Sequence, residues 1–438
     1  MNAPPQADAA VGFDESWYRQ SAQRPPPSPP LEGSIDTDVC IIGGGYTGLS
    51  AALELASAGI DAVLLEAHEV GAGASGRNGG VLGVGHNIDQ LELEECFGKV
   101  RARALWDLSL AANDLVRQRI AAQDIDCELT DGELTVAHRP SRLGPLEAAA
   151  EHLTRAYDFA PLTLLSAQQV AARLGTAAFH GGVLNGRSAH LHPLKLAYGE
   201  LAALLRTGVR VYEQTRVHRL RRQSATAGEG IEVATATGRV RARKVILACN
   251  GYLDGLVPAL DRLQMPINNF IAATEPLSEA TALEINRHNE AVVDTRFVVN
   301  YFHLSRDRRL IYGGGETYRA RYPRNIEAVV RPHLARTYPQ LAAIPLTHAW
   351  GGTLSISLNR LPQLGTLDGR IYWAQAYSGH GVALAHLGGQ LCARAVQGES
   401  PSFASLADLP QRAFPGGRWL RWPALVAGLL YYSLLDRL

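Results

Sequence analysis

The first regular pattern in the chain is a short apolar run, Val39–Ile42, followed by three glycines and then by apolar residues at helical spacing. A continuous apolar run of this length predicts a buried parallel strand, because both of its faces lie in a core. The helical spacing ends at Gly59, and Ala62–Leu65 repeats the strand pattern. The pattern therefore predicts a complete βαβ unit near the N-terminus.

The rest of the chain alternates between helical and strand-like stretches. Helical spacing covers residues 99–123, 194–205 and 382–396, and strand-like stretches cover 209–212, 231–237, 240–243, 245–248, 297–304, 309–313 and 371–374. Strands and helices therefore mix throughout, and residues 263–346 are the richest in strand-like stretches. This pattern predicts an α/β fold with some α+β character, in which an αβ core is interrupted by a mixed-sheet region.

Composition narrows the class of protein. A chain of 438 residues with 46% hydrophobic residues allows two or three domains with a sizeable core. Lys+Arg and Asp+Glu both number 42, and this balance argues against a nucleic-acid partner. Five cysteines without a CxxC pair exclude a zinc knuckle and favour reduced thiols, so we expect a cytoplasmic protein without a metal.

The three glycines begin a G-x-G-x-x-G motif, Gly43-x-Gly45-x-x-Gly48, between the predicted strand and helix. Gly43 permits the tight turn, Gly45 lets a pyrophosphate approach the backbone, and Gly48 lets helix and strand pack closely. The helix N-terminus offers free N–H groups to phosphates. Glu66 ends the next strand, where a carboxylate accepts hydrogen bonds from ribose hydroxyls and repels a 2′-phosphate. The motif therefore predicts an FAD or NAD site.

A second glycine-rich stretch, Gly71–Gly80, distinguishes between these dinucleotides, because an NAD domain does not need it. Six segments of the chain resemble the D-amino-acid oxidase, glycine oxidase and sarcosine oxidase superfamily of flavoproteins. They are CIIGGGYTGLSAALELASAG, GAGASGRNGG, HLHPLKLAYGE, IYGGGETY, YSGHGV and FPGGR. The chain resembles above all the bacterial gamma-glutamylputrescine oxidases. The resemblance implies an FAD-binding Rossmann-like domain of the glutathione-reductase-2 / D-amino-acid oxidase type, joined to a mixed-sheet substrate domain.

The resemblance also implies which residues hold the cofactor. Val217 matches a backbone contact to adenine, and residues 248–251 match a second turn near the dinucleotide. Because no histidine is adjacent to Asn78, we expect non-covalent FAD. The residues expected to contact FAD are Gly43, Gly45, Tyr46, Thr47, Gly48, Glu66, Ala74, Ser75, Arg77, Asn78, Gly79, Gly80, Val217, Ala248, Asn250, Gly379, His380, Gly381 and Val382.

Three residues are candidates for catalysis, and each has a plainer interpretation. His380 stands where glycines and a helix N-terminus can stabilise the negative charge of a reduced flavin, or it is a capping or packing histidine. His192 is a pocket-facing titratable group, or part of the N-cap of the helix that follows. Tyr301 lies on a predicted substrate-domain strand, or it is a core aromatic. Likewise, Arg77 contacts flavin or substrate, or it is a salt-bridged loop arginine.

The resemblance implies an FAD-dependent amine oxidase. Such an enzyme oxidises gamma-glutamylputrescine, or a related gamma-glutamyl polyamine, to an imine and then an aldehyde, and O2 is reduced to H2O2. In glycine oxidase-like enzymes an arginine clamps the substrate carboxylate, and here that position falls on Leu354, with Arg360 nearby. The absence of an arginine at this position favours a substrate whose reacting carbon bears no carboxylate, that is, an amine rather than a simple amino acid. The alternatives are oxidation of a cyclic or secondary amino acid such as L-pipecolate with another electron acceptor, a non-catalytic FAD-carrying subunit, and an NAD dehydrogenase.

The chain divides into an arm, two interleaved domains and a tail. We expect a Pro-rich arm over residues 1–30, in which Trp17 and Tyr18 dock on the body, and a helical tail over 406–438. The FAD-binding domain is expected from residues 31–105, 186–262 and 347–405, and the substrate domain from 106–185 and 263–346. The tail is apolar but too short to span a bilayer, so we expect packing on the body or on a second subunit rather than membrane association.

Overall fold

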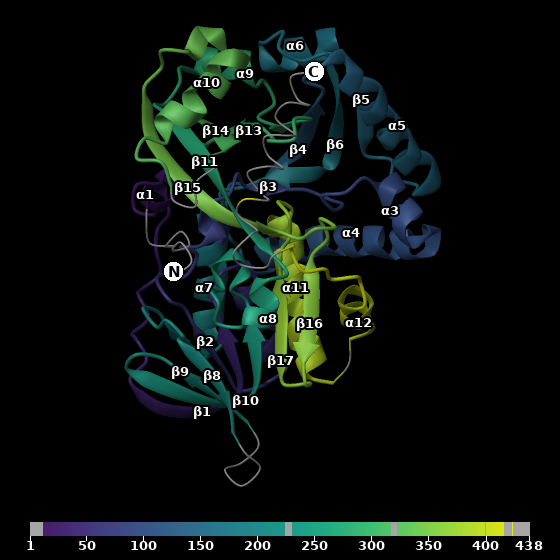
Figure 1. The fold of residues 1–438 in the computed structure, drawn as a ribbon. Helices are drawn as coiled ribbons and strands as arrows, with labels where there is room; N and C mark the ends of the chain where they lie inside the picture. Colours follow the sequence, from purple (N-terminus) through teal and green to yellow (C-terminus); the bar gives the residue numbers. More distant parts are fainter. Residues whose placement is uncertain (1–11, 224–229, 317–321, 399, 416–422, 424–438) are drawn as a thin grey trace.

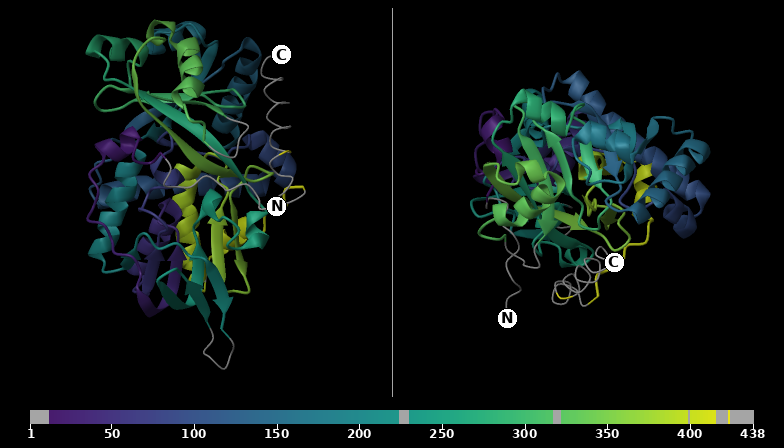
Figure 2. Two further views of the ribbon diagram at one scale, coloured as in Figure 1. Left: turned by 60° about the vertical axis from the view of Figure 1, so that its left-hand side comes forward. Right: turned by 90° about the horizontal axis from the view of Figure 1, so that it is seen from above.

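The computed structural model describes residues 12–223, 230–316, 322–398, 400–415 and 423. Two large sheets dominate it, one in each half of the molecule, and the chain passes between them several times (Figures 1 and 2). The mixed α/β architecture predicted from the sequence is confirmed.

The first sheet contains the βαβ unit that the sequence pattern predicts. Its strands run in the order β16-β17-β10-β1-β2-β7, and β8 and β9 extend it beside β10. The strands β17, β10, β1, β2 and β7 are parallel, while β16 and β9 are antiparallel to their neighbours. Their bounds are β1 Gly33–Ile42, β2 Ala62–Leu65, β7 Arg210–Tyr212, β8 Arg219–Arg222, β9 Ile231–Ala234, β10 Gly238–Leu247, β16 Gln363–Leu367 and β17 Ile371–Gln375.

Four helices build one core with the first sheet, two of them against its strands and the other two packed on those helices. They are α2 (Tyr46–Ser57), α4 (Lys99–Ala122), α7 (Pro193–Arg206) and α11 (Gly381–Val396). The helices α2 and α11 approach very closely, because a Cβ at Gly389 would lie 2.1 Å from the backbone oxygen of Thr47. Because β1 and β17 both run parallel to β10, the helices that follow them, α2 and α11, begin at the same edge of the sheet.

The second sheet is mixed, as predicted, and has the order β15-β11-β14-β13-β12-β4-β6-β3, with β5 beside β6. The pair β12–β4 is parallel and the other pairs are antiparallel. Its strands are β3 Val81–Leu82, β4 Thr130–Val136, β5 Leu162–Ser166, β6 Gly181–His190, β11 Met265–Thr274, β12 Ala291–Asp294, β13 Tyr301–Leu304, β14 Leu310–Glu316 and β15 Leu346–Ile356. The helices α6 (Ala167–Leu174), α9 (Glu279–Ile285) and α10 (Glu327–Thr337) pack on one face through a second core.

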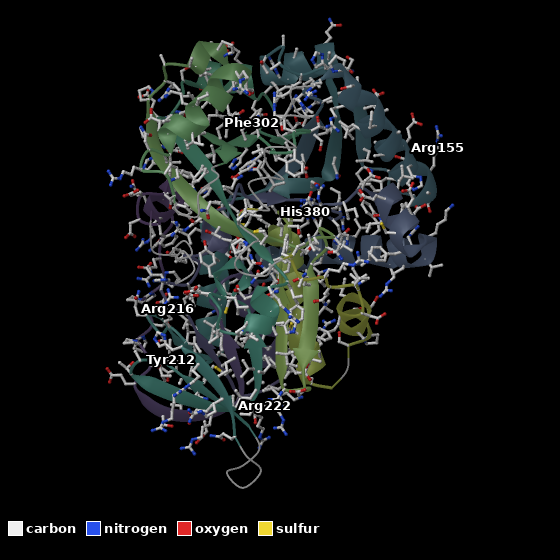
Figure 3. The ribbon with its side chains drawn as sticks, in the orientation of Figure 1. Arg155, Tyr212, Arg216, Arg222, Phe302 and His380 are labelled. Atoms are coloured by element: carbon white, nitrogen blue, oxygen red, sulfur yellow. The ribbon has the colours of Figure 1, made fainter. Side chains whose placement is uncertain are left out.

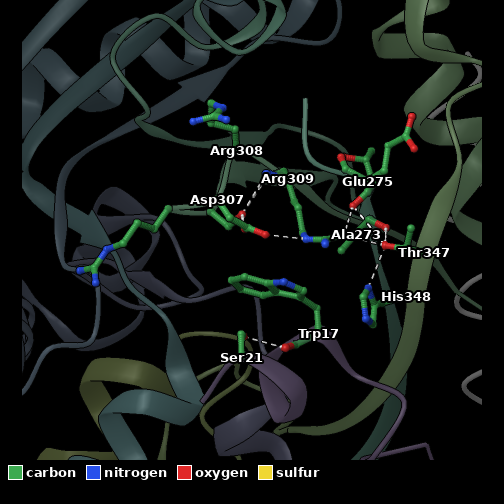
Figure 4. A network of polar contacts seen from close by, with 12 residues as sticks. Trp17, Ser21, Ala273, Glu275, Asp307, Arg308, Arg309, Thr347 and His348 are labelled. Carbon is green, nitrogen blue, oxygen red and sulfur yellow. Dashed lines mark hydrogen bonds and ion pairs between the residues drawn. The ribbon is translucent and has the colours of Figure 1, made fainter. Parts of the chain in front are cut away.

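The N-terminal arm docks between the two halves, as predicted for Trp17 and Tyr18. Both side chains belong to the short helix α1 (Trp17–Ser21), and both are buried. The ring of Trp17 points toward the polar network of Asp307 and Arg309 (Figure 4). The Gln20 side chain lies in hydrogen-bond contact with His348, at 2.9 Å. The remaining helices are α3 Gln90–Phe97, α5 Pro140–Ala156, α8 Pro258–Asp261 and α12 Pro401–Ala407, with short 3₁₀ turns at Ala74–Gly76, Asn250–Tyr252 and Pro339–Leu341.

The bounds of some predicted strands differ from those in the structure. Residues 240–243 and 245–248 were predicted as separate strands, but β10 runs through both because it pairs with β1 along its whole length. The strand predicted over 297–304 begins only at Tyr301. Before it, the buried carboxylate of Asp294 accepts hydrogen bonds from the backbone N–H of Arg296 and of Asn300, which folds the segment between them into a loop.

The boundaries of the chain segments that make up the FAD-binding domain and the substrate domain remain a prediction. The two sheets interleave along the chain, since β6 and β15 belong to the second sheet although part of their length falls within segments expected for the FAD-binding domain. Residues 1–11 of the arm and, apart from residue 423, the tail beyond residue 415 lie outside the described residues.

Candidate active site

A large cavity lies between the two sheets. It measures about 1080 Å³ and is bordered by the glycine-rich turns of the first sheet and by the inner face of the second sheet. Predicted cofactor contacts that border it are Gly43, Gly45, Tyr46, Thr47, Glu66, Ala74, Ser75, Arg77, Asn78, Gly79, Val217, Ala248, Asn250, Gly379, His380, Gly381 and Val382. The structure therefore brings together segments that are far apart in the sequence.

The first glycine-rich turn is packed so closely that a side chain at Gly43 or Gly45 would collide with its neighbours. Gly43 has a φ of +111°, and a Cβ there would lie 2.7 Å from the backbone oxygen of Ala248. At Gly45 a Cβ would lie 2.8 Å from Oγ of Ser75, which accepts a hydrogen bond from the Tyr46 N–H at 2.9 Å. Gly45 is the N-cap of α2 and makes no side-chain capping bond. A glycine N-cap has no side chain to cover the first turn, so the start of α2 borders the cavity with backbone N–H groups besides that of Tyr46, as a pyrophosphate site requires.

Glu66 closes the end of this turn. Its carboxylate accepts hydrogen bonds from the backbone N–H of Gly44 at 2.6 Å and of His68 at 2.9 Å. Burial raises the pKa of Glu66, and these two hydrogen bonds oppose the rise. Each carboxylate oxygen retains acceptor capacity for a hydroxyl group. The position and chemistry fit the binding of a ribose.

The second glycine-rich loop is held by two of its own side chains. The buried guanidinium of Arg77 donates to the backbone oxygens of Ala72 at 2.7 Å and Gly351 at 3.0 Å, and it lies 5.2 Å from the ring centre of Phe13. The Asn78 amide donates to the backbone oxygen of Ser75 and accepts from the Gly80 N–H. Arg77 therefore joins the loop to β15 and to the arm, a role that the sequence did not indicate.

Tyr301 borders the cavity, on the inner face of the second sheet. Its hydroxyl donates to the side-chain oxygen of Asn269 at 2.6 Å, and burial raises the pKa of Tyr301. The ring fits between two glycines, because a Cβ at Gly79 or Gly313 would lie within 2.3 Å of it. Tyr301 thus packs directly against the loop that is expected to border the flavin.

The start of α11 forms another wall. Its N-cap, His380, makes no side-chain capping bond. Burial, followed by the nearby charge of His86, lowers the pKa of His380 to about 4, so its imidazole is neutral near pH 7. The hydroxyls of Tyr377 and Thr47 are 2.6 Å apart, which ties this turn to the start of α2. Figure 3 places His380 near the middle of the molecule, between the half that holds Phe302 and the half that holds Arg216.

Three predicted residues do not border the cavity. Gly48 and Gly80 lie behind it, where each allows a close backbone approach. His192 is the N-cap of α7: its Nδ1 accepts from the Lys195 N–H at 3.1 Å, and its Nε2 lies 2.9 Å from Oγ of Ser21. This geometry matches the capping interpretation of His192, and the structure does not bring this residue together with the other catalytic candidates.

Other cavity residues escaped prediction. Asn269 on β11 and Glu133 on β4 both face the cavity, as does Phe297, over whose ring the Arg360 guanidinium lies at 5.4 Å. The alternation of apolar and polar residues in Thr130–Val136 was a usable signal for Glu133, because it separates the two faces of a strand. The signal does not say which ligand the polar face meets.

Comparisons with known proteins agree with this geometry. Residues 38–395 match the family model described as FAD dependent oxidoreductase. The chain belongs to this family. Its residues are 41% identical over 424 positions to the gamma-glutamylputrescine oxidoreductase of Escherichia coli (strain K12), covering 97% of this chain and 98% of that protein. They are 37% identical to the probable oxidoreductase OrdL of Rhizobium meliloti (strain 1021), covering 96% and 97%.

Solved structures of the family share the fold. Glycine oxidase from Geobacillus kaustophilus superposes with a TM-score of 0.70 at 20% identity, over 87% of this chain and all of that one. L-proline dehydrogenase from P. horikoshii gives 0.65 at 18% identity, over 84% and 95%. The resemblance to D-amino-acid oxidase-type flavoproteins is therefore confirmed: this member of the family is an FAD-dependent oxidoreductase. Among the residues that the structure describes, no helix has the length and apolarity needed to cross a membrane.

Proposed function

We propose that this family member oxidises the primary amine of gamma-glutamylputrescine, or of a related gamma-glutamyl polyamine. The product is an imine that water hydrolyses to an aldehyde and ammonia, and the two electrons taken from the amine reduce O2 to H2O2. The observation that carries the proposal is the 41% identity, over nearly the whole length of both chains, to a gamma-glutamylputrescine oxidoreductase. A second observation supports it: Leu354, where an arginine clamp for an α-carboxylate would be expected, is an apolar residue bordering the cavity.

The residues around the cavity fit FAD. The backbone donors at the start of α2 would hold the pyrophosphate, Glu66 the ribose and Val217 the adenine, while the start of α11 would stabilise negative charge on the flavin. Bound non-covalently there, FAD supplies the acceptor for the two electrons taken from the substrate.

The residues of the chain position the substrate and set the polarity and charge of the cavity around it. Tyr301 and Asn269 form a hydrogen-bonded pair on the cavity wall, which fixes the tyrosine ring against Gly79. The apolar side chains of Ile271 and Leu354 border the same cavity and reduce the access of water to it. A neutral His380 adds no positive charge that would repel a cationic amine.

The purified yellow holoenzyme tests this proposal. We expect H2O2 and aldehyde to form from gamma-glutamylputrescine at a kcat/KM at least tenfold above that for L-pipecolate or glycine. Acid precipitation should release the flavin into the supernatant, because its binding is non-covalent. Fast turnover of L-pipecolate without turnover of gamma-glutamylputrescine would reject the proposed substrate, and colour retained in the pellet would reject non-covalent binding.

A further inference from the structure

One acidic side chain of the second sheet points into the cavity. Along β4 the side chains alternate: Leu134 and Val136 enter the core under α6, α9 and α10, and Glu133 therefore faces the other way. The neighbouring strands present Val293 and Tyr301 to the cavity. Glu133 is thus on the same face as the residues that pack against the second glycine-rich loop.

The contacts of Glu133 are those expected of a side chain that binds a ligand, rather than of one that forms an ion pair within the protein. Among the described residues, no arginine, lysine or histidine forms an ion pair with it. Its Oε2 lies 3.4 Å from where a Cβ of Gly83 would be, so the carboxylate reaches the segment that follows the second glycine-rich loop. Burial raises the pKa of Glu133, and the Ser188 hydroxyl opposes this only in part.

The other acidic groups that border the cavity lie on the first sheet. Glu66 and Asp254, the further acidic residues bordering it in the described part of the chain, follow strands β2 and β10 of the first sheet. On the second sheet, Arg296 is paired with the buried Asp294. Glu133 is therefore the negative charge that this sheet offers to a ligand.

An amine substrate brings the matching charge. An aliphatic amine has a pKa of about 10.4, so it reaches the cavity as an ammonium ion near pH 7. Leaving water costs this ion much free energy unless a carboxylate pairs with it. We propose that Glu133 binds the ammonium group at the reacting end of the substrate. Glu133 lies close to Gly83, and its strand pairs with β12, the strand next to Tyr301. This position favours contact with the reacting end of the substrate over contact with its distal end. This inference rests on the proposed function insofar as it requires an amine substrate.

The test uses holoenzyme and two probes of the same length, n-butylamine and uncharged n-butanol. Their Kd values are measured from changes in the visible spectrum of bound FAD, without oxygen, in the wild type and in three variants. Glu133→Gln removes the charge at constant shape, and Glu133→Asp keeps it. Asp131→Asn is the matched control, since Asp131 lies on the same strand but is exposed and pairs with Arg117 at 2.7 Å.

We expect Glu133→Gln to weaken n-butylamine binding at least tenfold and n-butanol binding less than twofold. Glu133→Asp should recover part of the amine affinity, and Asp131→Asn should match the wild type. The inference is overturned by an amine affinity within twofold of the wild type, by equal losses for both probes, or by a wild type that does not bind n-butylamine. Should Glu133→Gln lose FAD, Glu133→Asp decides: the shorter carboxylate should lower the affinity for n-butylamine more than that for n-butanol, and an amine-to-alcohol affinity ratio equal to that of the wild type contradicts the inference.

These outcomes are separate from those of the proposed function. Whether the wild type oxidises gamma-glutamylputrescine decides the proposed substrate. The n-butylamine titration decides the role of Glu133 even when another amine proves to be the substrate.

Discussion

Arg77 shows how one side chain can hold a cofactor loop in place. Its planar guanidinium serves two backbone oxygens in different halves of the molecule, Ala72 and Gly351, and its face meets the ring of Phe13. The indole N–H of Trp350 also donates to the backbone oxygen of Arg77 at 3.1 Å. The loop that is expected to border the flavin is therefore held by contacts to Gly351 of β15, to Phe13 of the arm and to the side chain of Trp350.

Replacing Arg77 by lysine should be costly although the charge remains. An ammonium group cannot reproduce the fork that serves both oxygens, and a buried carbonyl left without a donor costs about 1–3 kcal/mol. We expect Arg77→Lys to lower the free energy of unfolding by about 2 kcal/mol and to weaken FAD retention, as measured by urea titration and by the flavin-to-protein absorbance ratio.

Arg155→Lys is the control for this change. Arg155 is exposed on α5, where it pairs with Glu151 one helical turn away (Figure 3). We expect its unfolding free energy to stay within about 0.5 kcal/mol of the wild type. Equal effects of the two substitutions would contradict the role given to Arg77.

At the scale of elements, the βαβ unit was predictable because its signals are local. The run Val39–Ile42, the glycine spacing and Glu66 lie within one short stretch, and each constrains the next. The cavity wall of the second sheet was not predictable in the same way. Asn269, Tyr301 and Glu133 come from three strands, and only the pairing of those strands shows that they share a face. His192 gives a clear local capping signal, which cannot report its distance from the cavity.

The packing of α2 on β1 gives a prediction at this scale. A Cβ at Gly48 would lie 1.8 Å from the backbone oxygen of Gly43, so an alanine there would force the helix away from the strand. We expect Gly48→Ala to reduce the FAD content of purified protein at least tenfold. The FAD content is measured as the ratio of the flavin absorbance at about 450 nm to the protein absorbance at about 280 nm.

Gly186→Ala is the matched control. A Cβ at Gly186 on β6 would meet its nearest atoms, both of Pro161, at 3.7 and 3.8 Å, which is ordinary van der Waals contact. Full FAD content in both variants would mean that α2 tolerates displacement, and the close approach would then have no role in binding.

Several histidines across the molecule are kept neutral by full or partial burial. Burial lowers the pKa of His303, His333 and His380 to about 4, and it lowers that of His190 and His192 well below the usual range. An unfolded chain takes up protons at these residues near pH 6.5, whereas the folded protein does not. The contribution of these groups to stability is therefore complete above pH 6.5 and is lost as the pH falls toward 4.

We expect the free energy of unfolding to fall continuously between pH 6.5 and about pH 4, as measured by urea titration across that range. His303→Asn should make the fall shallower by up to about 1.4 kcal/mol per pH unit, because one proton fewer is taken up on unfolding. A free energy of unfolding that is constant across this interval would contradict the prediction, as would an identical slope in His303→Asn.

The interleaving of the two sheets has a consequence for how the protein is made. The strand β1 pairs with β10, β10 pairs with β17, and α11 completes the cavity after β17. A nascent chain therefore carries its first glycine-rich turn out of the ribosome long before the neighbouring strand and the opposite wall exist. Flavin capture must wait until translation of nearly the entire polypeptide has finished, and a ribosome that stalls before β17 leaves a product in which β10 lacks its parallel neighbour and the pocket is incomplete.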